Sequence, residues 1–373
     1  MRDILGSVRS WYDSGRPLAL ATVVGTSDSA PRQPGAAMAV SAGGEVAGSV
    51  SGGCVEGAVY DLGTTVLDSG EPVLQTYGYS DSDAFAVGLT CGGSVTVFVQ
   101  AVDPVALPQL GEVLDTVEAD EPVALVTVIF GGWVGSRLAV WPDRVSGTLG
   151  ATGLDSAVTD DARGMLEQGT TGQRHYGPNG ERRRDEVTVF VESFQPPPRM
   201  LVFGAIDFAA AVARVGKFLG YRVTVCDARA VFATAKRFPD ADEVVVEWPH
   251  RYLARTPVDS RAVICVLTHD PKFDVPLLEV ALRTPAGYVG AMGSRRTHED
   301  RLARLREVGL TDGELNRLRS PIGLDLGART PEETAVAIAA EIVAVHWGGT
   351  GSPLRDTAGA IHRAGAHREP AVQ

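Results

Sequence analysis

The feature that most constrains the fold of this 373-residue chain is a regular alternation of apolar and helix-like segments after residue 199. After each short apolar run comes a segment in which apolar residues recur with helical spacing. The runs lie at 200–204, 222–226, 243–246, 261–267 and 286–291. This alternation is typical of a parallel sheet with helices on both faces. We therefore predict a C-terminal Rossmann-like domain with a doubly wound parallel sheet over residues 200–347. Its last helix begins behind Thr330-Pro331-Glu332-Glu333, which has the pattern of a capping box.

The residues before this alternation follow a mixed pattern. Val- and Thr-rich runs predict strands at 18–26, 36–41, 94–101, 122–130 and 187–193, and helical patterns occur around 55–68, 106–117 and 156–168. We expect a smaller mixed α+β domain over residues 1–192. The segment 193–199 contains three consecutive prolines, which hold the backbone extended, and we expect it to be the linker. The stretch 348–373 offers little apolar surface and is predicted to be a flexible tail.

Composition excludes several classes of protein. The chain has 34 Lys and Arg against 46 Asp and Glu, a net charge of −12, so it has no overall positive field for nucleic acid or a membrane surface. Its N-terminal residues contain scattered charges and no long apolar run, and we expect a cytoplasmic protein. The four cysteines are far apart, without a C-x-x-C pair. This spacing argues against a disulfide framework, a structural zinc site and an iron–sulfur cluster.

Ligands of open parallel sheets bind beyond the carboxyl ends of the strands. The first predicted strand ends at Gly204, which starts a turn like G-x-G-x-x-G/A but has Ile206 in place of the second glycine. The second strand ends at Asp227, at the usual offset of the acid that binds a ribose. Asp227 could equally cap the next helix, because the glycine turn is not intact.

Later strand ends carry further candidates. The fourth strand leads to His269 and Asp270, and the fifth to Gly293-Ser294-Arg295-Arg296 at the start of a helix. A helix N-terminus with a hydroxyl and two guanidinium groups favours a phosphate or another anion. Asp325 and Arg329 belong to a glycine-containing turn before the last helix that could close over the same crevice. In the alternative interpretation His269 is an ordinary loop residue, and Arg295 and Arg296 belong to a solvated helix face that includes Arg301.

Two loops of the first domain combine glycine with cysteine. They are Gly48-Ser-Val-Ser-Gly-Gly-Cys54-Val-Glu56 and Gly88-Leu-Thr-Cys91-Gly-Gly93. A bulky group can approach such flexible backbone, and a thiol there is a ligand for a soft metal or a persulfide sulfur. Cys54 and Cys91 could instead be small buried hydrophobes. Cys226 and Cys265 lie within strands, which favours a core position.

Six ordered segments resemble the xanthine dehydrogenase accessory protein family (XdhC/CoxI). They are ATVVGTSDSAPRQPGAAM (21–38), GSVSGGCVEGAV (48–59), GLTCGGSVTVFV (88–99), the strand–turn–helix from Met200, YVGAMGSRR (288–296) and SPIGLDLGARTPEE (320–333). The resemblance implies a chaperone of a cofactor rather than an enzyme. Such a protein binds molybdenum cofactor, supports its sulfuration together with a cysteine desulfurase, and delivers it to an apo molybdenum hydroxylase. The client would be of the xanthine dehydrogenase or carbon monoxide dehydrogenase type.

The resemblance also suggests where this cofactor would bind. The phosphate of the molybdopterin, in its mononucleotide or dinucleotide form, suits the segment 293–296, and its molybdenum and sulfur suit Cys54 or Cys91. The first domain would then cover the strand ends of the second. The family usually has a second glycine and a histidine where this chain has Ile206 and Asp207, which argues against NAD(P).

Two other functions stay open from the sequence. One is an NAD(P)-dependent oxidoreductase, with Asp227 on a ribose and His269 as acid and base. The other is a scaffold for a hydroxylase complex without a site of its own. Short apolar strands in excess of what one small sheet buries suggest a homodimer.

Overall fold

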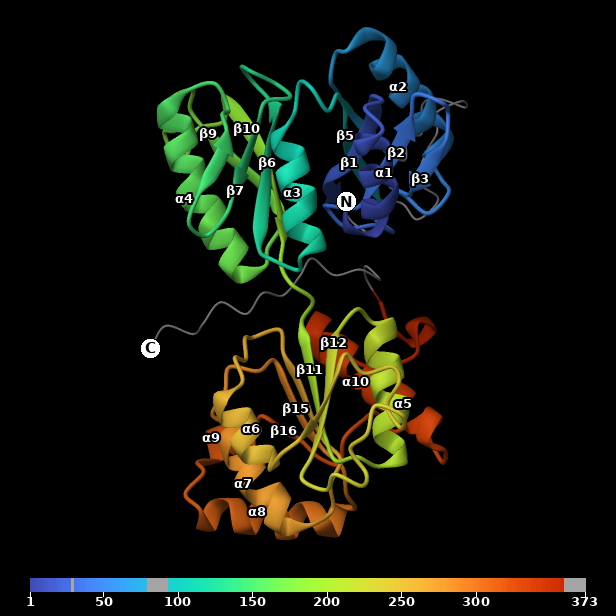
Figure 1. Ribbon diagram of the computed structural model, residues 1–373, viewed down its shortest axis with the longest axis vertical. Coiled ribbons are helices and arrows are strands. Elements are labelled where there is room, and N and C mark those ends of the chain that lie inside the picture. The colour runs from blue at the N-terminus through green and yellow to red at the C-terminus, as the bar shows by residue number, and fades with distance from the viewer. Residues whose placement is uncertain (28–29, 79–92, 359–373) are drawn as a thin grey trace. The chain divides into compact units, whose positions relative to one another are not determined.

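The computed structural model describes residues 1–27, 30–78 and 93–358, and Cys91 therefore lies outside the described residues. The chain divides into two compact units, Met1–Pro196 and Pro197–Ala358 (Figure 1). The first unit is the longer one, so the prediction of a smaller N-terminal domain is wrong. Strands β10 (Val187–Phe194) and β11 (Arg199–Phe203) take up both ends of the expected linker, which leaves residues 195–198 between them.

The first unit contains the same arrangement of elements twice. Its first sheet has the order β3 (Val46–Gly48), β2 (Ala37–Ser41), β1 (Leu18–Ser27), β5 (Ser94–Val102) and β4 (Val73–Tyr77). The second has the order β8 (Val145–Gly147), β7 (Arg137–Val140), β6 (Val123–Phe130), β10 and β9 (Gly172–Tyr176). A helix precedes each sheet, α1 (Leu5–Asp13) or α3 (Gln109–Glu118), and another follows its third strand, α2 (Glu56–Ser69) or α4 (Thr152–Gln168).

Register and side-chain contacts support an internal duplication. The β1–β5 pairing shifts register between Val23 and Gly25, and the β6–β10 pairing shifts at the corresponding place, opposite Thr188 and Val189. The pentapeptide VTVFV occurs at 95–99 in β5 and again at 187–191 in β10. The residue after the pentapeptide is Gln100 in the first copy and Glu192 in the second, and each contacts a glycine of the opposite copy. Gln100 donates from its side chain to Gly135 O at 2.8 Å, and Glu192 lies beside Gly35. The sequence analysis missed this repeat, although the repeated pentapeptide is a signal for it.

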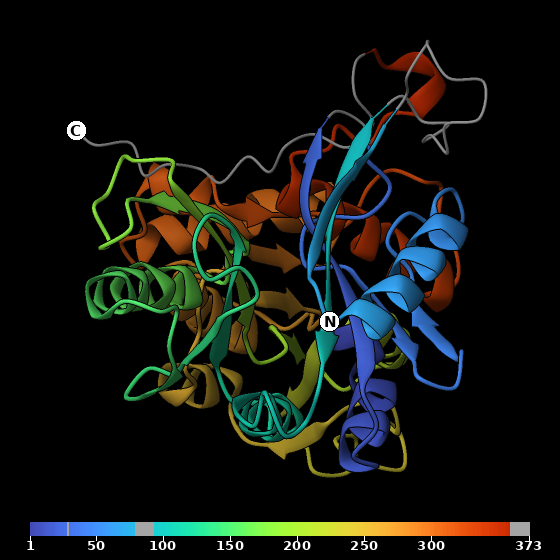
Figure 2. The same cartoon turned by 90° about the horizontal axis from the view of Figure 1, so that it is seen from above.

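Four apolar clusters hold the first unit together. The two sheets contact each other through Val24, Phe98, Ile129 and Phe190 at one end, and residues of α1 and α3 fill the space between them at the other. Helix α2 packs on the outer face of the first sheet and α4 on that of the second. Figure 2 shows these two helices on opposite sides of the paired sheets. The 3-10 helix Arg2–Ile4 precedes α1.

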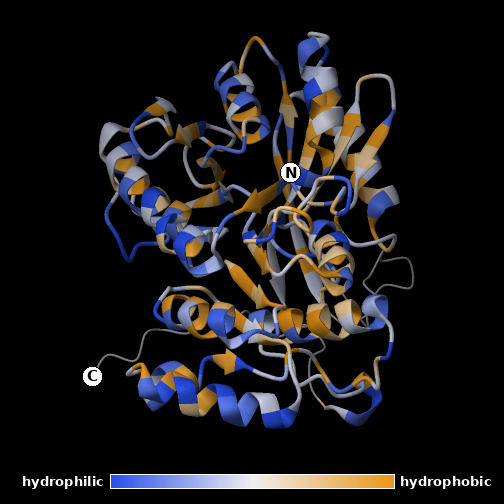
Figure 3. Cartoon of the chain, turned by 60° about the horizontal axis from the view of Figure 1, so that its bottom comes forward, coloured by the Kyte–Doolittle hydropathy of each residue, from blue (hydrophilic) through white to orange (hydrophobic). Residues whose placement is uncertain are grey.

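The second unit is the predicted parallel sheet. Its order is β13 (Glu243–Val246), β12 (Arg222–Asp227), β11, β14 (Val263–Val266), β15 (Tyr288–Ala291) and β16 (Leu318–Arg319). Helices α5 (Asp207–Phe218) and α10 (Pro331–Trp347) pack on one face. The other face bears α6 (Pro249–Arg255), α7 (Pro271–Ala281), α8 (Arg295–Glu307) and α9 (Asp312–Leu315). Figure 3 shows hydrophobic strands and helices of alternating hydropathy.

Two details of this unit test the sequence expectations. The capping box of α10 is confirmed, because the Thr330 hydroxyl accepts from Glu333 N and the Glu333 carboxylate accepts from Thr330 N. A helix after every strand is wrong for β12, since residues 228–242 form turns. Side chains hold these turns: Asp242 accepts from Val223 N at 2.7 Å. The 3-10 helix Leu354–Asp356 follows α10, and no helix in the described ranges has both the length and the hydropathy to cross a bilayer.

Candidate functional site

The first candidate site is the loop between β3 and α2, which we call the thiol loop (residues 49–55). It begins after Gly48, which has φ of +84° and whose added Cβ would lie 2.3 Å from Ala37 O. Gly52 and Gly53 also have positive φ, and an added Cβ on either would meet nothing within 4 Å. Cys54 is half-buried, two residues before α2 begins at Glu56. The cysteine therefore follows open, glycine-rich backbone, while its side chain packs partly against the apolar cluster under α2.

The carboxylate of Glu56 holds the thiol loop. Its Oε1 accepts from Ser49 Oγ at 2.6 Å and from the backbone N–H groups of Val50, Ser51 and Gly52 at 3.2, 2.9 and 2.9 Å. Its Oε2 accepts from Ser51 Oγ, Gly53 N and Val55 N at 2.6, 2.8 and 3.2 Å. Burial alone would raise the pKa of Glu56, but the hydrogen bonds from Ser49 and Ser51 lower it to about 2. The carboxylate is therefore ionised at neutral pH. We call it, with the hydrogen bonds that it accepts from residues 49–55, the Glu56 clasp.

Ser51 connects this clasp to the cysteine. Its side chain is buried, and Oγ accepts from the backbone N–H groups of Cys54 and Val55, each at 3.0 Å. The same Oγ donates to Glu56. Glu56 is part of the predicted loop motif, but the sequence analysis gave it no role. Its position could have indicated one, because it is a carboxylate at the start of a helix that follows a glycine-rich loop.

The second copy has a counterpart of this loop without a thiol. Gly147 has φ of +95°, and its added Cβ would lie 2.4 Å from Arg137 O. Asp155 accepts from Thr148 Oγ1 at 2.7 Å and from Leu149 N at 2.6 Å, at the same sequence separations as Glu56 from Ser49 and Val50. These are equivalent contacts at the start of an equivalent helix.

In the second copy, neighbouring atoms fill the space at the position equivalent to the cysteine. By this alignment Gly153 corresponds to Cys54, and its added Cβ would lie 2.3 Å from Asn179 O. The ring of Trp133 lies against Gly150, whose added Cβ would be 2.4 Å from the indole. Only the first of the two described loops therefore combines a cysteine with open backbone.

The other two cysteines in the described residues lie in the core, as the sequence predicts. Cys226 in β12 and Cys265 in β14 are 1% and 0% exposed, which confirms that prediction. Burial raises the pKa of each thiol to about 12. Neither is a candidate for thiolate chemistry.

The second candidate site is the carboxyl edge of the parallel sheet. Gly204 follows β11 with φ of +110°, and its added Cβ would lie 2.9 Å from the Thr268 methyl group, so the turn needs glycine. Asp227 is 3% exposed, and its carboxylate accepts from Ala205 N at 2.8 Å and from the Arg229 guanidinium at 2.7 and 2.9 Å. Burial would raise the pKa of Asp227, but these hydrogen bonds hold it below its usual value.

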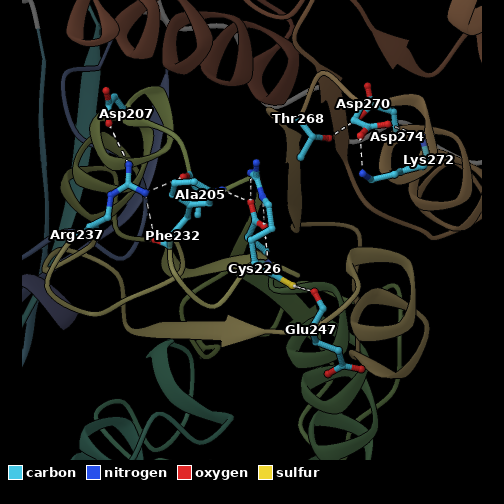
Figure 4. Close-up of polar contacts among 12 residues, drawn as sticks. Ala205, Asp207, Cys226, Phe232, Arg237, Glu247, Thr268, Asp270, Lys272 and Asp274 are labelled. Carbon is cyan, nitrogen blue, oxygen red and sulfur yellow. Dashed lines mark hydrogen bonds and ion pairs between the residues drawn. The ribbon is translucent and has the colours of Figure 1, made fainter.

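This turn is poorly suited to a dinucleotide. Both carboxylate oxygens of Asp227 already accept from the chain's own donors, where a ribose hydroxyl would need them. Asp207 is exposed as the first residue of α5, so it puts a negative charge where a pyrophosphate would bind. Arg237 donates to Asp207 and to the carbonyls of Ala205 and Phe232 (Figure 4), which fixes the turn from the other side.

The anion segment 293–296 follows β15. Ser294 is the N-cap of α8 and accepts from Thr297 N at 3.1 Å, while Arg295 and Arg296 are exposed on the first helical positions. The strand order brings the ends of β11, β14 and β15 side by side, and with them Gly204, His269 and Gly293. Two cationic side chains at a helix N-terminus form a surface that can bind a phosphate.

The remaining predicted site residues have local roles or face solvent. His269 is exposed, and Asp270 caps α7, accepting from Lys272 N at 3.1 Å and Nζ at 2.9 Å (Figure 4). Asp325 and Arg329 are exposed in the loop before α10. Their closure over the sheet edge, and the covering of that edge by the first unit, stay predictions.

A buried ion pair organises this edge, and the sequence analysis missed it. Arg301 and Asp274 are 4% and 3% exposed, and Arg301 Nη2 lies 2.9 Å from Asp274 Oδ2. Arg301 also donates to Met292 O at 2.8 Å and to Ser320 Oγ at 3.0 Å, and Thr268 donates to Asp274. The pair thus ties together the residues that follow β14, β15 and β16. The alternative of a solvated helix face is wrong for Arg301.

Comparisons with known proteins find relatives of both units. The model of the XdhC Rossmann domain matches residues 200–342, and that of the XdhC and CoxI family matches 11–78 and 116–177, one stretch in each copy. A probable xanthine dehydrogenase subunit of Bacillus subtilis (strain 168) is 26% identical over 334 residues, which are 87% of this chain and 92% of that protein. The "Molybdenum cofactor insertion chaperone PaoD" of Escherichia coli (strain K12) is 26% identical over 332 residues, 89% and 84% of the two chains.

A solved structure has the same fold. The crystal structure of a protein described as a xanthine dehydrogenase from Bacillus halodurans matches with a TM-score of 0.68 and 22% identity, over 91% of this chain and 95% of the other. Together the family models match most of the chain and both of its units. The chain therefore belongs to the XdhC and CoxI family.

Proposed function

We propose that this protein binds molybdenum cofactor as cargo, supports its sulfuration and delivers it to a molybdenum hydroxylase. The observation that carries the proposal is the half-buried Cys54 on open glycine backbone, held by the Glu56 clasp. The molybdenum of the cofactor is already held by soft dithiolene sulfurs, and a thiolate is a protein ligand of the same kind. Support also comes from PaoD, whose name describes the insertion of this cofactor and which aligns over most of both chains.

The second unit offers a place for the phosphate of the same cargo. Arg295 and Arg296 at the start of α8 can form charge-assisted hydrogen bonds with it. Asp227 would keep the neighbouring turn in shape and would not bind a ribose. Nothing in this turn favours the NAD(P)-dependent alternative.

The proposed partners follow from this role. A cysteine desulfurase would supply sulfur for the cofactor, and an apo hydroxylase of the xanthine dehydrogenase or carbon monoxide dehydrogenase type would receive it. The Bacillus subtilis relative is named as part of such an enzyme. Four isolated cysteines do not provide the iron–sulfur ligands of the enzyme itself, which favours an accessory role. A homodimer and a cytoplasmic location stay predictions.

The first prediction tests the thiol. The protein is produced in a host that makes molybdenum cofactor and is purified without oxygen, and bound molybdenum and oxidised pterin fluorescence are measured. Cys54→Ala should lower both by about tenfold or more, because one lost ligand contact of about 1.4 kcal/mol is a factor of ten. Cys226→Ala is the matched control, since that thiol is buried in β12. A wild-type protein that carries no pterin would contradict the proposal.

The second prediction tests the anion segment. The double variant Arg295→Ala/Arg296→Ala should retain about tenfold less pterin, because a hydrogen bond to a charged group contributes about 1.5 to 3 kcal/mol. Arg304→Ala is the control, an exposed arginine further along α8. Retention by the wild type should also fall as salt rises. Equal retention in the double variant and the control would remove the phosphate site from the proposal.

A further inference from the structure

We propose that Glu56 is a positioning residue, which sets the backbone geometry of Cys54 through Ser51 and thereby controls how the thiol is presented. The inference rests on the proposed function of Cys54, but it concerns a different residue and a different property. Glu56 does not touch the cargo in this proposal. It acts only through the hydrogen bonds that it accepts from the thiol loop.

The internal duplication separates the structural part of this clasp from the rest. Contacts that occur in both copies are needed for the shared fold: a carboxylate at the helix start, one hydroxyl and one backbone N–H. Asp155 makes these contacts in a copy that has no thiol. The equivalent contacts of Glu56, to Ser49 and Val50, are therefore explained by folding alone.

Glu56 makes five additional contacts, and all of them lie in the segment that carries the cysteine. They are to Ser51 N, Ser51 Oγ, Gly52 N, Gly53 N and Val55 N, between 2.6 and 3.2 Å. A second layer follows from Ser51, whose Oγ accepts from Cys54 N and Val55 N at 3.0 Å. The copy with a thiol thus has more hydrogen bonds than its fold needs, and they shape residues 51–55.

The backbone of this segment needs such support. Gly52 and Gly53 have φ of +80° and +119°, in a region that glycine enters easily and also leaves easily. No side chain packs over the position of an added Cβ at either residue. Val50 and Val55 anchor the two ends of the loop in the apolar core. Packing does not fix Gly52 and Gly53 between them, and the carboxylate of Glu56 holds this part of the backbone. Replacement of Glu56 should therefore affect the reactivity of Cys54 more than the stability of the first unit.

The test measures the alkylation of Cys54 by iodoacetamide at pH 7 in the full-length protein, with the modified peptide quantified by mass spectrometry. Glu56→Gln should raise the rate at least fivefold, because a loosened loop exposes the thiol and a nearby negative charge is lost. Glu56→Asp keeps the charge and part of the hydrogen bonds, and its rate should return to within about twofold of the wild type. Peptide-level readout separates Cys54 from the other three cysteines.

Asp155→Asn provides the matched control. It weakens the equivalent clasp in the copy without a thiol, so it should lower the melting temperature about as much as Glu56→Gln and leave the Cys54 rate unchanged within twofold. Should Glu56→Gln not fold, Ser51→Ala removes the hydroxyl link to Cys54 N and is expected to raise the rate in the same way. Equal rates in Glu56→Gln, Ser51→Ala and the wild type would overturn the proposal.

The outcome is independent of the cargo. Iodoacetamide reports on the thiol without any cofactor, so altered alkylation together with unaltered pterin retention in Cys54→Ala would uphold the positioning role and reject the proposed function. Unaltered alkylation together with lost retention in Cys54→Ala would do the opposite.

Discussion

Replacement of Asp274 by alanine should lower the free energy of unfolding of the second unit by about 3 to 5 kcal/mol. The substitution leaves the guanidinium of Arg301 buried without its counter-ion, and the desolvation cost of that charge is no longer offset. It also removes the acceptor of the Thr268 hydroxyl. Urea unfolding, with hydrogen exchange read on peptides of α7 and α8, measures the loss and assigns it to this unit.

Two further variants make this prediction specific. Glu279 lies on the same helix, α7, and forms an exposed ion pair with Arg283 at 2.9 Å, so Glu279→Ala should cost less than about 0.5 kcal/mol. Asp274→Ala/Arg301→Met removes both charges and should be more stable than Asp274→Ala alone. If the double variant were the least stable of the three, the uncompensated charge would not be the cause.

The same pair links stability to the anion segment. Arg301 lies on α8, the helix that begins with Arg295 and Arg296, and it is held to the residues that follow β15 and β16. A network with several partners at the ends of three strands fixes where the helix N-terminus lies. The segment 293–296 thus has a rigid base although its arginines are exposed.

Much of the second unit could be predicted from the sequence because its signals are local. A buried parallel strand is a short run of apolar residues, and the last helix has a capping box that is readable as Thr330 and Glu333. Arg301 could not be predicted in this way. It stands among charged residues of α8, and the carboxylate that pairs with it is 27 positions earlier in the chain. The only local signal is Asp274, on the apolar face of α7.

The first unit illustrates a different limit. Its longer strands were predicted, but β7 was not, because a run of four buried residues is too short to stand out. The short edge strands β3, β4, β8 and β9 were also missed, because their exposed and half-buried residues have no clear alternation. Without them the two halves did not look alike. The thiol loop could be identified from its glycines and Cys54, whereas the clasp depends on how one carboxylate meets seven donors in space.

Alanine at Gly48 or at Gly147 should destabilise the first unit by about 3 kcal/mol or more, and by similar amounts, because left-handed backbone and overpacking both cost free energy. Both glycines end the third strand of their copy with positive φ, at +84° and +95°. Both would place a Cβ against a backbone carbonyl, 2.3 Å from Ala37 O and 2.4 Å from Arg137 O. A carbonyl in a paired strand cannot move aside as a flexible side chain can, so the pairing of the third strand should be lost.

A third glycine separates the two causes of this effect. Gly70 ends α2 with φ of +73° and has nothing within 4 Å of an added Cβ, so Gly70→Ala isolates the cost of the backbone conformation, about 1 kcal/mol. Thermal and urea unfolding of the three variants would give the comparison. Equal losses for all three would mean that conformation alone matters and that the close carbonyl contacts do not.

The two variants should nevertheless differ in how much pterin they retain. Gly48 immediately precedes the thiol loop, so Gly48→Ala should displace Ser49 and Ser51 from Glu56 and lower the retention of pterin. Gly147→Ala disturbs a loop in which Gly153 stands at the place of the cysteine, and the protein that remains folded should retain its cargo. Pterin retained per folded molecule measures this difference. Similar losses in both variants would indicate that the second copy contributes to binding and is not merely a structural counterpart.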